Sequence, residues 1–374
     1  MRERVVVAMS GGVDSSVAAA TLANDGYDVI GITMKLFCYG ETVPDRPCCS
    51  LDSIADARRV CDRLGVPHYV VNMERSFGEQ VIDDFVTEYS RGRTPIPCVR
   101  CNTFTKFRDL LRTADGLKAR WIATGHYARV EAGVLRRGSD AAKDQSYFLW
   151  GIDRSVLGRM LLPVGALTKP ETRKRARDLG LGVVANKVES QDICFVPDGD
   201  HVAVIAKRLG AAAPALSPGP FVTSDGRTIG RHAGYARYTV GQRRGLPGGH
   251  REPLYVVAIR PEDRAVVVGQ RHELLGHTVI ARDVNWLVSQ APPVGSRVTV
   301  QVRHRARAVG ARILSCDADA IEVALIEPVT AITPGQSLVI YRDDVVLGGG
   351  LIDGPRELAV LRRRSAADTT AAST

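Results

Sequence analysis

A glycine-rich loop between an apolar run and a helix-like segment constrains this chain more than any other feature. Residues 4–9 (RVVVAM) have the pattern of a buried strand, residues 10–16 read SGGVDSS, and a helical pattern follows. Strand–loop–helix units of this kind bind phosphate, because small residues leave the backbone amides at the helix N-terminus open to an anion. The serine hydroxyls add donors, and Asp14 is expected to cap the helix or to help hold a magnesium ion.

The loop lacks the lysine that most phosphate loops carry, and it matches neither GxxxxGK(S/T) nor GxGxxG. A cradle of amides and hydroxyls suits a pyrophosphate that departs when the α-phosphate is attacked. We therefore interpret the loop as a site for ATP with Mg2+ and for nucleotidyl transfer, rather than for kinase or GTPase chemistry. An ordinary glycine turn capped by Asp14 is the alternative interpretation.

The order of the predicted elements indicates an α/β chain with additional β domains. In the first third, strand-like and helix-like segments alternate, which predicts a doubly wound parallel sheet with ligands at the carboxyl ends of its strands. Further on, proline and glycine become frequent, and short alternating segments predict β structure that ends in a barrel. We predict an ATP-binding catalytic domain (1–210), a small mainly-β domain (211–275), a C-terminal β-barrel (276–360) and a disordered tail (361–374).

Net charge and hydropathy restrict the partners and the compartment. The formal charge of +9 favours a polyanion such as RNA, although simple solubility explains it equally well. No apolar run reaches the roughly 18 residues that span a membrane, and the first residues lack the pattern of a signal peptide. We expect a cytoplasmic protein without membrane contact, and we take a monomer as the default.

The stretch PIPCVRCNTF contains the first reactive thiol that we predict. Prolines at 95 and 97 hold the chain extended, and Asn102 or Thr103 is expected to cap the helix that follows. Cys101 would then lie at or just before the N-terminus of that helix, among basic side chains. Both features lower the pKa of a thiol, so Cys101 is a candidate nucleophile or ligand.

The remaining cysteines leave several alternatives open. Cys98 and Cys101 form a CxxC pair, which occurs in dithiol redox sites, in half of a zinc site and in cluster sites. The adjacent Cys48 and Cys49 are poorly spaced for the other half of a zinc site. Cys194, in DICF, is by itself best interpreted as a buried core cysteine. We assign no role to Cys48, Cys49 and Cys316.

Six stretches in this order, SGGVDSS, TPIPCVRCNTFTKF, ATGHYARV, KDQSYFLW, ESQDICFVPDGD and YTVGQRRGLPGG, resemble the bacterial-type tRNA-specific 2-thiouridylases. These belong to the PP-loop ATP pyrophosphatase superfamily, and the resemblance extends from about residue 4 to 353. It implies a tRNA-uridine 2-sulfurtransferase that adenylates the C2 oxygen of the wobble uridine and adds sulfur from a persulfide. The products are 2-thiouridine, AMP and pyrophosphate. The implied partners are tRNAs with lysine, glutamate and glutamine anticodons, and a cysteine desulfurase or sulfur-carrier protein.

The resemblance also implies roles for individual residues. Cys101 matches the nucleophile, and Cys194 matches the cysteine that carries the persulfide. The implied ATP contacts are Ala8, Met9, Ser10, Gly11, Gly12, Val13, Asp14, Ser15, Met34 and Gly125. The implied tRNA contacts are Ile96, Pro97 and Cys98 at the target base, with Lys143, Asp144, Gln145, Arg303 and His304 elsewhere.

The chain departs from the common pattern of that family in two places. Ile96-Pro97-Cys98 stands where many members have Asn-Pro-Asp, so that Cys98, Cys101 and Cys194 would be able to hold a [4Fe–4S] cluster in place of a persulfide. The stretch VRHRARAV replaces Arg-Tyr-Arg-Gln, which weakens the assignment of His304. Two other functions stay open: an amide-forming synthetase of the PP-loop group, and an RNA-binding protein with a relic nucleotide site. His126 is best interpreted as a structural histidine at a strand end.

Overall fold

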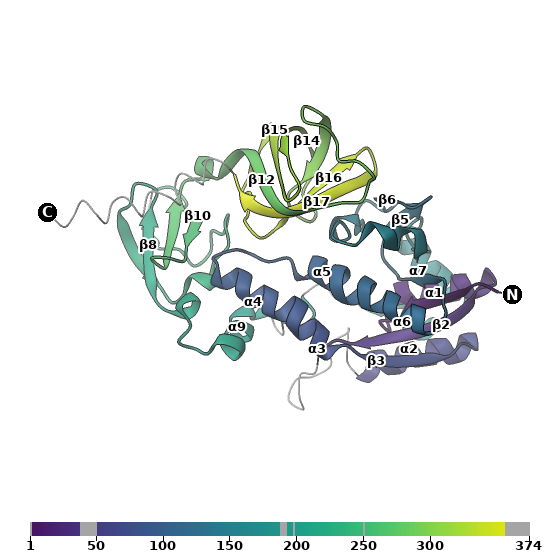
Figure 1. The fold of residues 1–374 in the computed structure, drawn as a ribbon. Coiled ribbons are helices and arrows are strands. Elements are labelled where there is room, and N and C mark those ends of the chain that lie inside the picture. Colours follow the sequence, from purple (N-terminus) through teal and green to yellow (C-terminus); the bar gives the residue numbers. More distant parts are fainter. Residues whose placement is uncertain (1, 38–50, 188–192, 197–198, 250, 356–374) are drawn as a thin grey trace.

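The computed structural model describes residues 2–37, 51–187, 193–196, 199–249 and 251–355. The cysteines at 48 and 49 and the predicted tail over 361–374 lie outside these residues. Three parts follow one another along the chain: an α/β part, a small β-sheet, and a barrel that packs above the helices joining the other two (Figure 1). Among the described residues, no helix combines the length and the apolar character needed to cross a membrane.

The N-terminal part is built on a five-stranded sheet in which every pairing is parallel. Its strands, in spatial order, are β3 (His68–Asn72), β2 (Asp28–Lys35), β1 (Arg4–Ala8), β4 (Trp121–Ala123) and β7 (Met160–Leu161). Successive residues of β1 point to opposite faces: Val5 and Val7 join one apolar core and Val6 joins another. The predicted doubly wound parallel sheet is therefore confirmed.

Helices cover both faces of this sheet. The core of one face includes residues of α1 (Val13–Asn24), α2 (Leu51–Leu64), α7 (Lys169–Asp178) and α8 (Gly182–Ala185). The other face packs against α5 (Pro97–Arg100), the π-helical η2 (Cys101–Asp109) and α6 (Leu110–Gly116), which run on as one helix. A second continuous helix consists of α3 (Glu74–Phe77), the π-helical η1 (Gly78–Ile82) and α4 (Asp83–Ser90). These two composite helices connect the α/β part with the β domains (Figure 1).

The predicted start of the helix after the proline pair is wrong. The helix begins at Pro97, and Asn102 and Thr103 lie inside it rather than capping it. The physical reason is that proline suits the first helical position, where its missing N–H would have no partner and its fixed φ already fits the helix. Asn102 instead donates to the Phe148 carbonyl at 3.0 Å.

The β domains follow the α/β part, after α9 (His201–Leu209). The small sheet contains β10 (Tyr255–Arg260), β11 (Ala265–Gly269), β8 (Gly219–Thr223) and β9 (Thr228–His232), in that order. The barrel contains β12 (Leu275–Trp286), β15 (Ala320–Thr330), β14 (Val309–Cys316), β13 (Arg297–Gln301), β16 (Ser337–Arg342) and β17 (Val345–Gly354). Pairing of β12 with β17 closes it, which confirms the predicted C-terminal barrel. Short 3-10 turns are η3 (Ser146–Phe148), η4 (Arg154–Arg159), η6 (Pro214–Leu216), η7 (Tyr235–Arg237) and η8 (Arg271–Leu274).

The three parts share their apolar cores. One cluster joins α5, η2 and α6 to barrel residues that include Leu287, Val339 and Tyr341. A hairpin of β5 (Ala128–Glu131) and β6 (Val134–Arg137) extends the barrel sheet, because β6 pairs with β17. A second cluster joins α4 to the small sheet. Burial across these boundaries favours a fixed arrangement of the parts.

Candidate active site

The residues predicted to contact ATP meet at one edge of the parallel sheet. Strands β2, β1 and β4 are neighbours and point the same way, so their carboxyl ends lie side by side. The loop after β1, Met34 near the end of β2, and Gly125 just after β4 therefore converge. Gly125 lies so close to the loop that a Cβ on it would come 2.5 Å from the Ser15 backbone nitrogen. This edge is where doubly wound sheets bind ligands.

The loop itself has the shape of an anion cradle. Gly11 has φ +69°, a conformation that favours glycine, and its α-carbon faces the Ser53 carbonyl too closely for any side chain. Ser15 Oγ accepts from the Ser10 amide at 3.2 Å, and Ser16 Oγ donates to the Gly12 carbonyl at 2.8 Å. The N-cap residue of α1 is a glycine without a capping side chain, which leaves the first amides of the helix for an oxygen ligand.

Two lysines from distant segments lie against the loop, and sequence reasoning missed both. Buried Lys169, on α7, holds the Asp14 carboxylate with Nζ–O distances of 2.8 and 2.9 Å, and the Tyr127 hydroxyl donates to the same carboxylate at 2.8 Å. Lys187 Nζ lies 3.2 Å from the Gly11 carbonyl oxygen and 2.7 Å from a carboxylate oxygen of Asp56. Each lysine is paired with a carboxylate, Lys169 with Asp14 and Lys187 with Asp56, so Asp14 forms an ion pair instead of capping α1.

Cys101 and Cys194 are brought to one hydrophobic cluster. Cys101 is 7% exposed and belongs to a buried cluster with Phe77 and Phe85, against which the half-buried Cys194 also packs. Phe195 explains this placement, since its ring contacts Phe77 and Phe85 edge-on with centroid distances of 5.6 and 5.1 Å. Met34, at the nucleotide edge, packs against the same cluster. Cys101 is therefore a member of one apolar cluster against which both Cys194 and Met34 pack.

The expected surroundings of the Cys101 thiol are only partly found. Because the helix begins at Pro97, Cys101 lies a turn inside it, beyond the first amides whose partial positive charge would stabilise a thiolate. The Arg100 guanidinium binds Asp84, with distances of 2.6 and 3.0 Å to one carboxylate oxygen. The prediction that Cys101 stands at a helix N-terminus is wrong.

The three thiols do not form a metal-binding set. Cys98 is exposed, whereas Cys101 is buried in the apolar cluster. Within the part of the chain that the structure describes, no three or more His, Cys, Asp or Glu side chains are grouped so as to hold a metal ion. These residues do not fit a [4Fe–4S] cluster, and we derive no step through one.

The two predicted tRNA-contacting segments, 143–145 and 303–304, lie together between the barrel and the α/β part. The His304 ring packs on Phe148 with a centroid distance of 4.4 Å, and burial lowers the pKa of His304. Arg303 is exposed and donates to Thr333 Oγ1 at 3.0 Å. The Phe148 carbonyl also accepts from Asn102, which is in the helix that carries Cys101. The contact between His304 and Phe148 therefore lies next to that helix.

Asp144 and Gln145, two of the five residues in these segments, make hydrogen bonds that stabilise the local structure. The Asp144 carboxylate accepts from Arg137 at 2.9 Å and from the Ser146 hydroxyl at 3.0 Å. Gln145 Oε1 accepts from the Tyr127 amide at 2.9 Å. These contacts shape the segment in which the half-buried Lys143 lies.

His126, beside Gly125, is expected to make the protein sensitive to acid. Burial, with Lys106 nearby, lowers the pKa of His126 to about 3, so that the folded protein keeps the ring neutral while the unfolded chain takes up a proton below about pH 6.5. The free energy of unfolding therefore falls as the pH drops below 6.5, by up to about 1.4 kcal/mol per pH unit for this one proton.

The substitution His126→Gln should make that decline shallower, and urea unfolding at pH 7, 6 and 5 measures it. The matched control is His277→Gln, at an exposed position on the barrel. In this variant the free energy of unfolding should change with pH as it does in the parent chain. An unchanged slope in His126→Gln would contradict the assignment. With a pKa of about 3 the ring is not an imidazolium at pH 7, so His126 does not act there as a protonated acid.

A parallel sheet with a glycine-rich loop of the phosphate-binding type, continued by a small β-sheet and a closed barrel, defines a nucleotide-binding α/β protein with two additional β domains. Family models match the same three parts: "tRNA methyl transferase HUP domain" over residues 3–198, "tRNA methyl transferase PRC-barrel domain" over 207–270 and "Aminomethyltransferase beta-barrel domain" over 276–352. The chain belongs to the family of tRNA-specific 2-thiouridylases.

Curated relatives show how extensive this similarity is. The chain is 51% identical to the tRNA-specific 2-thiouridylase MnmA of Rhodospirillum centenum over 364 residues, which cover 93% of this chain and 91% of that protein. It is 48% identical to the MnmA of Geobacter metallireducens over 362 residues, 94% of this chain and 97% of that protein. A solved 4-thiouridine synthetase–RNA complex with bound ATP matches weakly, with a TM-score of 0.35, 19% identity, and coverage of 52% of this chain and 45% of that one.

Proposed function

We propose that this chain is an ATP-dependent tRNA-uridine 2-sulfurtransferase that forms 2-thiouridine at the wobble position. One observation carries the proposal: Cys101 and Cys194 share a cluster with Met34, which stands at the nucleotide edge of the sheet. One apolar cluster thus connects the nucleotide edge with both thiols. The names of the curated relatives support the same activity.

In the first step the uracil C2 oxygen attacks the α-phosphate of ATP, and pyrophosphate leaves. The amides at the start of α1 and the hydroxyls of the loop hold the phosphates, and Met34 packs against the adenine. A magnesium ion, which accompanies the triphosphate, neutralises part of its charge. The C2 oxygen of uracil is a poor leaving group. Once it is adenylated it leaves readily, because it departs as part of AMP.

In the second step a persulfide on Cys194 supplies the sulfur. Its terminal sulfur attacks C2, the C2–O bond breaks, and AMP departs. The Cys101 thiolate then attacks Cys194 Sγ and breaks the S–S bond, whose electron pair stays on the sulfur attached to C2. The products are 2-thiouridine and a Cys101–Cys194 disulfide, which an external dithiol reduces before the next cycle.

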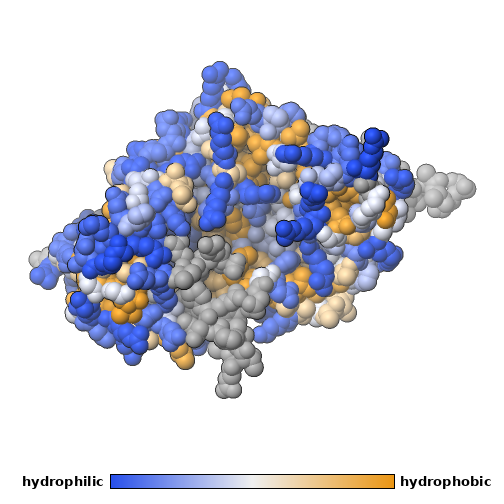
Figure 2. Space-filling view, turned by 180° about the vertical axis from the view of Figure 1, so that it is seen from behind, coloured by the Kyte–Doolittle hydropathy of each residue, from blue (hydrophilic) through white to orange (hydrophobic). Residues whose placement is uncertain are grey.

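RNA recognition involves more than one part of the chain. The target base leaves the anticodon stack to reach the thiols, with Ile96, Pro97 and Cys98 beside it. Segments 143–145 and 303–304 contact the anticodon stem-loop, and the domain bounds that we propose are 1–210, 211–275 and 276–360. On the face seen in Figure 2, hydrophilic residues cover much of the described surface, with hydrophobic patches between them. The substrates are tRNAs with lysine, glutamate and glutamine anticodons, a desulfurase or carrier supplies sulfur, and the protein acts as a cytoplasmic monomer.

The test incubates the protein with unmodified tRNA, ATP, Mg2+, cysteine and a cysteine desulfurase. A gel that contains an organomercury compound retards only thiolated tRNA. Retarded tRNA together with AMP supports the proposal. AMP formed from a small amide acceptor without tRNA would support a synthetase instead, and tRNA binding without AMP formation would support a relic nucleotide site.

A further inference from the structure

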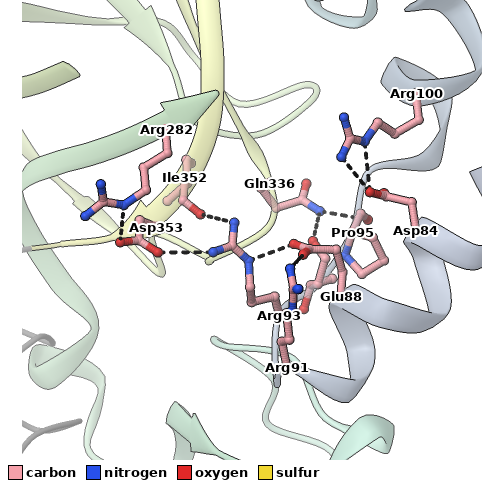
Figure 3. A network of polar contacts seen from close by, with 11 residues as sticks. Asp84, Glu88, Arg91, Arg93, Pro95, Arg100, Arg282, Gln336, Ile352 and Asp353 are labelled. Carbon is pink, nitrogen blue, oxygen red and sulfur yellow. Dashed lines mark hydrogen bonds and ion pairs between the residues drawn. The ribbon is translucent and has the colours of Figure 1, made fainter. Parts of the chain in front are cut away.

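Residues 93–95, here called the strap, join α4 to the segment that carries Cys98 and Cys101. The strap is bound on several sides (Figure 3). The Arg93 guanidinium donates through Nε to Glu88 on α4 at 2.7 Å and through Nη1 to Asp353 on β17 at 3.1 Å. Its Nη2 donates to the Ile352 carbonyl at 3.3 Å. One side chain therefore ties the last turns of α4 to the last strand of the barrel.

The barrel also holds the backbone of the strap. The Thr94 amide donates to the Pro334 carbonyl at 2.8 Å. Gln336 Nε2 donates to the carbonyls of Thr94 and Pro95, at 3.0 and 3.3 Å. The Thr94 hydroxyl reaches Thr239, in the chain between the small sheet's strands, at 3.1 Å. Three backbone groups that immediately precede Ile96 are thus fixed by the β domains.

These contacts are screened from water and are specific in geometry. The side chains of Arg93 and Glu88 are 18% and 10% exposed. Because the effective dielectric constant is lower there than at an open surface, the attraction between their charges is stronger. A guanidinium holds its N–H donors in a fixed planar arrangement. Here they donate to three acceptors in two domains: Glu88, Asp353 and the Ile352 carbonyl. An ammonium at the same position lacks that planar geometry, so lysine would not reproduce the arrangement.

We propose that Arg93 and Gln336 are positioning residues for sulfur transfer, through which the barrel sets the place of the Cys98–Cys101 segment relative to the nucleotide edge. This inference rests on the proposed function. Neither side chain touches the thiols or the phosphate loop, so adenylation proceeds without them. A displaced strap moves the thiol helix, and water then attacks the adenylated C2, which returns uridine and AMP without sulfur.

The experiment measures 2-thiouridine formed per AMP released, under single-turnover conditions with full-length protein and tRNA. Arg93→Gln should lower this ratio roughly tenfold, because small displacements of reacting groups have effects of this order or larger. The rate of AMP formation should stay within about twofold of the parent chain. The ratio of 2-thiouridine to AMP in Arg93→Lys should lie between that of Arg93→Gln and that of the parent chain. Because Arg93→Gln leaves two carboxylates without their guanidinium, the neutral variant Gln336→Leu provides a second test and should lower the ratio in the same direction.

The matched control is Arg282→Gln. Arg282 binds the other oxygen of Asp353 at 3.0 Å, with a side chain 56% exposed, and it belongs to the barrel face rather than to the strap. The Arg282→Gln variant should form as much 2-thiouridine per AMP released as the parent chain. The proposal is overturned if folded Arg93→Gln and Gln336→Leu keep the parent ratio, or if Arg282→Gln lowers it equally.

A second readout does not depend on activity. Iodoacetamide alkylation of Cys101, which is buried, should become roughly tenfold faster in Arg93→Gln, since the segment opens more often when its anchor is lost. An unchanged alkylation rate would overturn the proposal even if the parent chain made no thiouridine. Absence of thiouridine and AMP in the parent chain would instead count against the proposed function.

Discussion

Replacing Cys194 with serine is expected to abolish 2-thiouridine formation, with a loss of at least about a thousandfold, because a hydroxyl cannot carry the sulfane sulfur. AMP should still form, since adenylation does not involve this thiol. Cys101→Ser should block product release at the following step, so that tRNA stays attached to Cys194 through sulfur. Organomercury gels measure the product, and non-reducing gels measure the attached tRNA. Cys316→Ser, in barrel strand β14, is the matched control and should retain full activity.

The same series separates the persulfide from a cluster mechanism. Cys98 is exposed, whereas Cys101 is buried, so on the persulfide route Cys98→Ser should keep most of the activity. Loss of activity in Cys98→Ser equal to that in Cys194→Ser, together with iron and acid-labile sulfide in anaerobically purified protein, would reject the persulfide route. Full activity of Cys194→Ser would reject the assignment of that thiol altogether.

Local patterns predicted the sheet edge well because the signals there are short-range. The apolar run of β1, the glycines after it and the helical pattern of α1 are contiguous, and parallel strands place their carboxyl ends together whatever the rest of the chain does. Alternation of apolar residues in the last third likewise predicted strands, and the closure of β12 on β17 follows from strands that curve around a shared core.

The partners of the loop and of the strap could not be predicted, because they depend on long-range packing. Lys169 and Lys187 reach Asp14 and Gly11 from segments that carry no phosphate-binding pattern of their own. Cys194 alone has the character of a core cysteine, and only the docking of Phe195 between two phenylalanines brings it to the cluster that contains Cys101. The helix start was missed for a local reason: the preference of Pro97 for the first helical position outweighed the capping ability of the residues that follow.

Replacing Gly125 with alanine is expected to weaken ATP binding by more than roughly tenfold and to suppress AMP and thiouridine together. A Cβ at this position would lie 2.5 Å from the Ser15 nitrogen and 2.6 Å from the Asp14 carbonyl carbon. Both are backbone atoms of the phosphate loop, which cannot turn aside as a flexible side chain can. The methyl group must therefore push the start of α1 away from the end of β4, and the amides that face the phosphates move with it.

The measurement is the increase in melting temperature on adding ATP, alongside calorimetric titration of ATP. The parent chain should be stabilised, while folded Gly125→Ala should show little increase. Gly116→Ala, at the end of α6, adds the same methyl group where no atom lies within 4 Å, and it should respond to ATP like the parent chain. Parent-like ATP affinity in Gly125→Ala would mean that the nucleotide does not lie between these strands, and the assignment of the loop to ATP would then be wrong.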